Sequence, residues 1–96
     1  MASWLVRRRL TQNTSRLSSL RAELAQIDEQ FDVFTSDADD QALRAMVSET
    51  PGAAFEANDA RKHADAMARH RQHVIDKIRE LEVRQDELLD KLSAGA

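Results

Sequence analysis

Apolar residues recur every three or four positions over the first third of the chain, which is the spacing of a helix with one apolar seam. Asn13 is the one polar interruption of this heptad pattern. The core positions of this first seam are Val6, Leu10, Asn13, Leu17, Leu20, Leu24, Ile27, Phe31 and Phe34. The last part of the chain repeats the pattern at Ala57, Ala60, Ala64, Met67, Arg71, Val74, Ile78, Leu81, Gln85, Leu88 and Leu92. Two such seams predict two helices that pack against each other.

The two seams fit together as an antiparallel pair, in which the numbers of facing residues add up to a constant. A sum of 98 joins core positions throughout, and it places Asn13 opposite Gln85 and Phe34 opposite Ala64. A slip of one heptad would set both amides against Leu or Ile, at a cost of roughly 1–3 kcal/mol for each unpartnered polar group. We therefore expect an all-α, coiled-coil-like antiparallel helical hairpin, with residues 1–96 as a single domain.

The same sum places the apex of the hairpin near residue 49, inside the segment 48–52. This segment holds the only Pro of the chain, at position 51. Thr50 is a suitable N-cap, and Pro51 suits the first position of the helix that follows. The pattern predicts a long return helix over residues 52–92.

The stretch before the apex departs from a clean helical pattern. Ser36 followed by Asp39 resembles a capping box, and acidic residues crowd the turn that would follow it. The apolar residues beyond it are also out of phase with the first seam: Leu43, Met46 and Val47. We therefore expect an arm over residues 4–34, a break near 35–40 and a short helix over 37–48.

The return helix has a wider apolar stripe than a two-helix seam needs. Ala68, Ile75 and Leu89 lie beside the core positions. A stripe of this width is typical of a helical bundle. We expect a second copy or another protein to complete a bundle by covering Ile75 and Leu89.

Charge is distributed unevenly behind a formal net charge of −3. Residues 1–21 carry five Arg and no acid, residues 22–59 carry ten acids and one base, and residues 60–96 are close to balanced. The chain has no Cys, which excludes disulfides and fits a reducing compartment. It also has no apolar run that approaches a membrane span, and the arginines follow its first apolar residues rather than preceding them as in a signal peptide. We expect a cytoplasmic protein.

Candidate chemistry is sparse. The chain has no Cys, Tyr or glycine-rich phosphate loop, and a bare hairpin lacks the concave pocket that shifts catalytic pKa values. His63, His70 and His73 have a spacing at which imidazoles bind zinc or nickel, or sense pH, but no firm third ligand accompanies them. Solvation of a charged helix explains the same residues. We expect a protein that is not an enzyme and has no metal or cofactor site.

The basic start of the chain, WLVRRRL, is the sharpest charged feature. Arg7, Arg8 and Arg9 beside Trp4 have the composition of a contact with phospholipid head groups or nucleic acid. Arginines without interleaved aromatics are a weak nucleic-acid signal in an acidic chain. The alternative is an exposed helix start whose arginines pair with Asp86, Glu87 and Asp90, with Trp4 left as an anchor for a partner.

The segment DADDQA, residues 37–42, fits the pattern D-x-x-D-x-A. This pattern resembles the coiled-coil tip of bacterial RNA polymerase secondary-channel regulators. The resemblance covers six residues and implies that acids at a hairpin end reach towards a catalytic metal. Three features depart from these regulators: the predicted apex lies about ten residues further on, the zinc-binding Cys typical of one such family is missing, and so is the globular second domain typical of another. Helix capping explains the same acids.

These observations lead to three functional hypotheses. The first is a non-enzymatic interaction module, a small oligomer or accessory (adaptor) subunit that binds protein through Trp4, Leu5, Arg7, Arg8, Arg9, Ile75 and Leu89. The second is a transcription regulator that contacts RNA polymerase through the acidic end, Asp37, Asp39 and Asp40. The third is a peripheral membrane adaptor that uses Trp4 and Arg7–Arg9.

Overall fold

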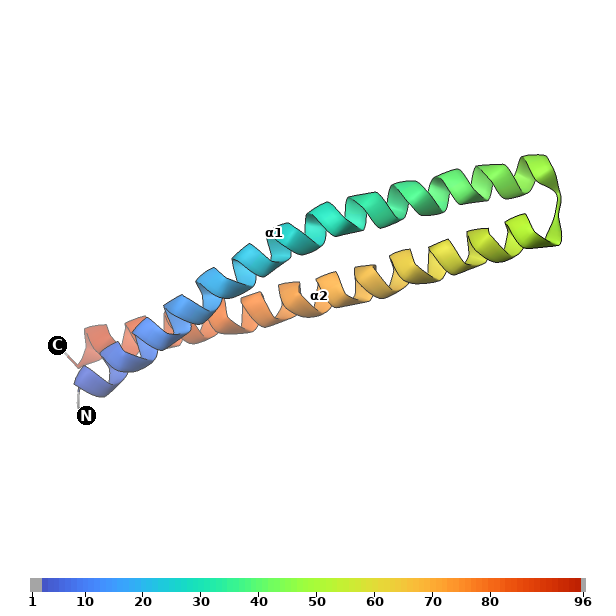
Figure 1. Ribbon diagram of the computed structural model, residues 1–96. Coiled ribbons are helices and arrows are strands. Elements are labelled where there is room, and N and C mark those ends of the chain that lie inside the picture. The colour runs from blue at the N-terminus through green and yellow to red at the C-terminus, as the bar shows by residue number, and fades with distance from the viewer. Residues whose placement is uncertain (1–2, 96) are drawn as a thin grey trace. The chain divides into compact units, whose positions relative to one another are not determined.

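Two long helices make up nearly all of the computed structural model, which describes residues 3–95. Helix α1 covers Ser3–Ser48 and helix α2 covers Pro51–Ala94 (Figure 1). Glu49 and Thr50 join them, and no strand occurs within residues 3–95. The predicted all-α helical hairpin is confirmed.

The turn is built as the sequence predicted. The Oγ1 atom of Thr50 accepts a hydrogen bond from the backbone N–H of Ala53 at 3.2 Å, so Thr50 caps α2. Pro51 occupies the first helical position, where its missing N–H is no loss. Glu49 takes the left-handed conformation with φ of 52° and donates its N–H to the carbonyl of Ala45, which ends α1.

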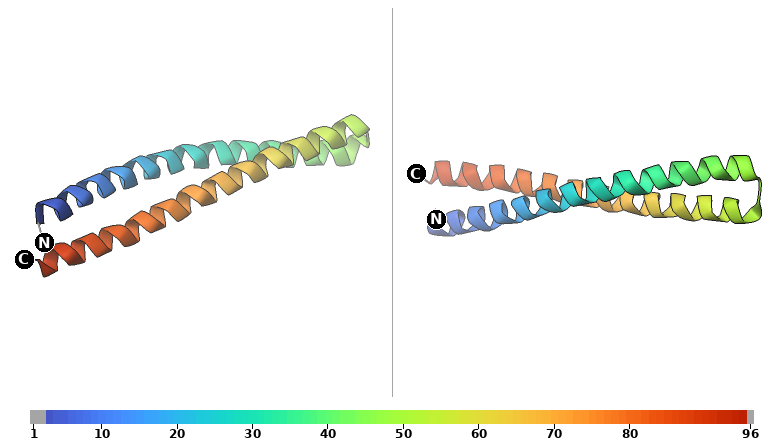
Figure 2. Two further views of the ribbon diagram at one scale, coloured as in Figure 1. Left: turned by 90° about the horizontal axis from the view of Figure 1, so that it is seen from below. Right: turned by 45° about the horizontal axis from the view of Figure 1, so that its top comes forward.

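The chain divides into two compact units, and the first of them contains the turn (residues 25–72). Within this unit the end of α1 and the start of α2 lie side by side (Figures 1 and 2). Ala38, Ala60 and Ala64 form a buried cluster, and Phe34 packs against it. The pairs Phe34–Ala64 and Ala38–Ala60 each add up to 98, so the predicted register holds in this unit.

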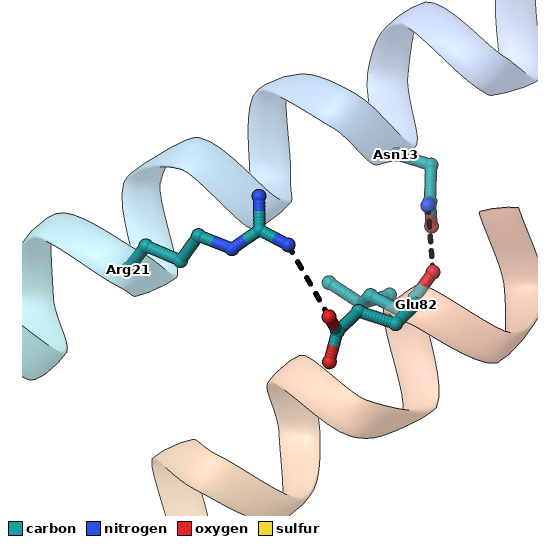
Figure 3. Close-up of polar contacts among 4 residues, drawn as sticks. Asn13, Arg21 and Glu82 are labelled. Atoms are coloured by element: carbon teal, nitrogen blue, oxygen red, sulfur yellow. Dashed lines mark hydrogen bonds and ion pairs between the residues drawn. The ribbon is translucent and has the colours of Figure 1, made fainter.

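The second unit joins the start of α1 to the end of α2, and its described residues are 3–24 and 73–95. Its buried core residues are Val6, Asn13, Leu17, Leu20, Val74, Ile78 and Leu88. Asn13 donates its side-chain N–H to the backbone carbonyl of Leu81 at 2.8 Å (Figure 3). Leu81 lies one helical turn before the expected partner Gln85, so the predicted layer is correct to within a turn.

An ion pair on the surface spans the same two helices in this unit. The guanidinium of Arg21 lies 3.4 Å from the carboxylate of Glu82 (Figure 3). Both side chains are about half exposed, and such pairs contribute little to stability. The core residues therefore carry the packing of this unit.

The expected break in α1 is absent, and that prediction was wrong. Helix α1 continues through residues 35–40, so Ser36 does not begin a new helix and residues 37–48 are not a separate one. The reason is that the seam continues in alanine: Ala38 is buried and Ala45 is half buried, each in its heptad position. The core position between them is the half-buried Gln41, so the seam keeps its heptad spacing through this stretch with small and polar residues.

Candidate protein-binding surface

Four large apolar side chains are exposed next to the turn, and we call them the apolar tip. Their exposed fractions are 61% for Leu43, 74% for Met46, 85% for Val47 and 71% for Phe55. Isolated apolar residues are common on protein surfaces, but a group of them marks a contact site more often. The apolar tip is therefore the strongest candidate for a functional surface in the part of the chain that the structure describes.

The apolar tip is exposed because the seam at this end is made of alanine. Ala38 and Ala60 pack in the core here, while Ala45 and Ala53 are half buried. Since α1 does not restart, Leu43, Met46 and Val47 stay out of phase with this seam and face away from it. The phase shift of these residues had been attributed to a helix start at Ser36, which the structure does not contain.

An open groove lies beside two residues of the apolar tip, Leu43 and Val47. Residues from the last turns of α1 and the first turns of α2 line about 470 Å³: Leu43, Arg44, Val47, Ser48, Ala53 and Glu56. The hydroxyl of Ser48 donates to the carbonyl of Arg44 at 2.7 Å, so this polar group is satisfied within its own helix. Leu43, Val47 and Ala53 consequently offer an apolar surface with few competing polar groups.

The segment that carries the groove is acidic, and the charged residues that line the groove itself are Arg44 and Glu56. Residues 37–59 contain six acids, and Arg44 is their only base. Two of the acids are engaged: Asp39 accepts a hydrogen bond from Arg61 at 3.0 Å across the two helices, and Asp59 lies 3.4 Å from His63. Asp40, Glu49 and Glu56 are exposed. The groove therefore combines apolar side chains with a net charge of −5 over this segment.

The predicted acidic end is placed on the body of a helix and not at the turn. Asp37, Asp39 and Asp40 are exposed in α1, whose last residue is Ser48. The expected role of these acids in capping is excluded because the helix does not begin there. Asp39 instead pairs with Arg61.

The predicted basic residues lie in the first two turns of α1. Trp4 is 65% exposed, Leu5 is half buried, and Arg7, Arg8 and Arg9 are exposed. Among their predicted acidic partners, Glu87 lies 3.6 Å from Arg84 of its own helix. Because Trp4 and the three arginines are exposed, their indole and guanidinium groups are accessible for contacts.

Of the two residues expected to meet a partner on α2, Leu89 is the more open. Leu89 is 45% exposed and Ile75 is half buried. Leu89 lines a second open groove of about 620 Å³ together with Leu10, Gln85 and a row of hydroxyl residues: Thr11, Thr14, Ser15, Ser18 and Ser19. Ile75 is not part of this groove.

His63 makes two local contacts. The ring of His63 stacks on Phe34 with a centroid distance of 6.3 Å, and its Nε2 lies 3.4 Å from Asp59. Within residues 3–95 no three His, Cys, Asp or Glu side chains converge on a position for a metal ion. His63 therefore has a packing role next to the alanine cluster.

Neither helix is long and apolar enough to cross a bilayer, as far as residues 3–95 are concerned. Comparisons with models of known protein families, with curated proteins and with solved structures find no match for this chain. The functional argument therefore depends on the surface chemistry of the chain itself.

Proposed function

We propose that this protein is a non-enzymatic, cytoplasmic interaction module that binds another protein through the apolar tip. The observation that supports the proposal is the exposure of Leu43 and Val47 in one groove, with Met46 and Phe55 also exposed near the turn. Burying such side chains contributes about 25 cal/mol for each Å² of apolar surface removed from water. A complex in which a partner covers the groove gains this free energy, whereas in the free chain the same apolar surface stays exposed to water.

The form of the tip also suits binding by a preformed surface. The residues of the groove belong to helices, and the turn between them is fixed by the Thr50 cap and by Pro51. A rigid element loses little conformational entropy when it binds. The protein would act as an adaptor or accessory subunit that presents this end to its partner.

Site-specific photo-crosslinking in cells that express the protein tests the proposal. A benzoylphenylalanine at position 47 should give a discrete crosslinked protein band, because Val47 is the most exposed apolar residue of the tip. The matched control is position 33 of the same helix, where Val33 is 68% exposed but outside the groove. The same crosslinks from both positions, or none from position 47, would contradict a binding role for the tip.

A further inference from the structure

The groove of the apolar tip has the form of a site for a helix. Leu43 and Val47 are one turn apart on α1, and Ala53 supplies a small residue from α2. A ridge of side chains on a third helix packs into a groove of this kind between two helices. Amphipathic helices bind such grooves through apolar anchors spaced three or four residues apart.

The charge around the groove selects among the possible occupants. With six acids and one base, residues 37–59 repel the phosphates of nucleic acids and the head groups of anionic lipids. A second copy of the tip would bring the same net charge of −5 against the first, so a symmetric contact between tips is disfavoured as well. A positively charged protein segment is attracted.

We infer that the occupant of this groove is a basic amphipathic helix of a partner protein, an inference that rests on the proposed function. Its apolar side chains cover Leu43 and Val47. Its Lys and Arg side chains pair with Asp40, Glu49 and Glu56, since Asp39 is already paired with Arg61. The apolar contacts supply affinity, and the ion pairs supply orientation and a faster encounter.

Titration of the full chain with two synthetic peptides tests this inference. One peptide carries Leu at helical three-and-four spacing with Lys elsewhere, and its twin carries Glu in place of Lys. The Leu/Lys peptide should bind, bind more weakly as salt is raised, and shift the backbone amide resonances of residues 43–56. The Leu/Glu twin should bind at least about tenfold more weakly because like charges meet at the groove.

Protein variants locate the site. The double variant Leu43→Gln and Val47→Gln should lose at least about tenfold in affinity for the Leu/Lys peptide. Val33→Gln, which removes an exposed valine of the same helix outside the groove, should bind as the wild type does. Far-ultraviolet circular dichroism of both variants verifies that the helices remain.

Four results would overturn the inference. Equal binding of the two peptides would show that charge does not select the partner. Unchanged affinity of the double variant, or amide shifts centred on other acids of the chain, would show adhesion away from the groove. Self-association of the wild type through the tip in the absence of peptide would make a second copy the occupant. In each case a crosslink from position 47 to a different protein would still support the proposed function, so the two failures are distinguishable.

Discussion

Asn13 is a buried amide in an apolar seam, and its hydrogen bond explains how it is tolerated there. The acceptor, the carbonyl of Leu81, lies inside α2 and so also belongs to the hydrogen-bond ladder of that helix. Removing the Asn13 donor would leave that carbonyl satisfied. The amide therefore adds specificity of register more than it adds stability.

We predict that Asn13→Leu raises the melting temperature. The substitution replaces a buried amide with an apolar side chain and leaves no unpartnered group behind, so stability should rise by roughly 1 kcal/mol. Thermal circular dichroism measures this change, and light scattering reports whether the chain also begins to associate. A lower melting temperature would mean that the amide makes a larger net contribution than its one hydrogen bond.

Thr35 presents the opposite situation, because its hydroxyl is buried and has no hydrogen-bond partner among the described residues. An unpartnered hydroxyl costs roughly 1–3 kcal/mol. Thr35→Val keeps the shape of the side chain and its β-branching, so we predict higher stability in urea unfolding. Thr35→Ser retains the hydroxyl and serves as the control, which should not gain stability.

At the scale of elements, the seams, the register and the turn could all be predicted from the sequence. Heptad spacing specified the facing pairs, and Thr50 with Pro51 specified the start of α2. The continuity of α1 was missed because alanines such as Ala38 carry its seam at this end. An alanine contributes little to a hydrophobic pattern, whereas the nearby Leu43 contributes strongly.

The candidate site was missed for the same reason. Leu43 and Val47 were found to be out of phase with the first seam, and this was attributed to a helix restart at Ser36 instead of to an exposed surface. The sequence did contain a signal for this surface. The antiparallel register, in which the numbers of facing residues add up to 98, pairs Ala38 with Ala60 and Ala45 with Ala53. Extending that register past Phe34 leaves the larger apolar residues outside the seam.

Glu49 is the strained residue of the turn, and we predict that Glu49→Gly is stabilising. A side chain at a φ of 52° is disfavoured by contacts of its Cβ atom, which glycine lacks. After allowance for the greater freedom of glycine in the unfolded chain, stability should rise by roughly 1 kcal/mol. This corresponds to a melting temperature about 4–8 °C higher for a domain of this size.

Glu49→Ala separates backbone strain from charge at the turn. Alanine removes the carboxylate and keeps the Cβ atom, so its melting temperature should stay close to that of the wild type. If alanine and glycine stabilised the chain equally, repulsion among the acids near the turn would be the cause and not the φ angle.

At the scale of the whole molecule, the second groove bears on self-association. Leu89 is 45% exposed beside Leu10, and a second copy that covers this groove would complete a helical bundle. We predict that the wild type associates as its concentration rises and that Leu89→Glu shifts it towards monomer. Multi-angle light scattering measures both, with Val83→Glu as the control because Val83 is exposed and outside this groove. A wild type that stays monomeric at high concentration would contradict this prediction.

The central claim is that the apolar tip serves binding and not folding, and one paired measurement tests it most directly. The melting temperature of the double variant Leu43→Gln and Val47→Gln is measured. The same preparation is then tested for how much it binds of the partner protein that crosslinks to position 47. Both side chains are mostly exposed, so the free energy of unfolding should change by no more than about 0.5 kcal/mol while recovery of that protein is lost. Undiminished recovery, or a loss of recovery that accompanies unfolding of the hairpin, would contradict the claim.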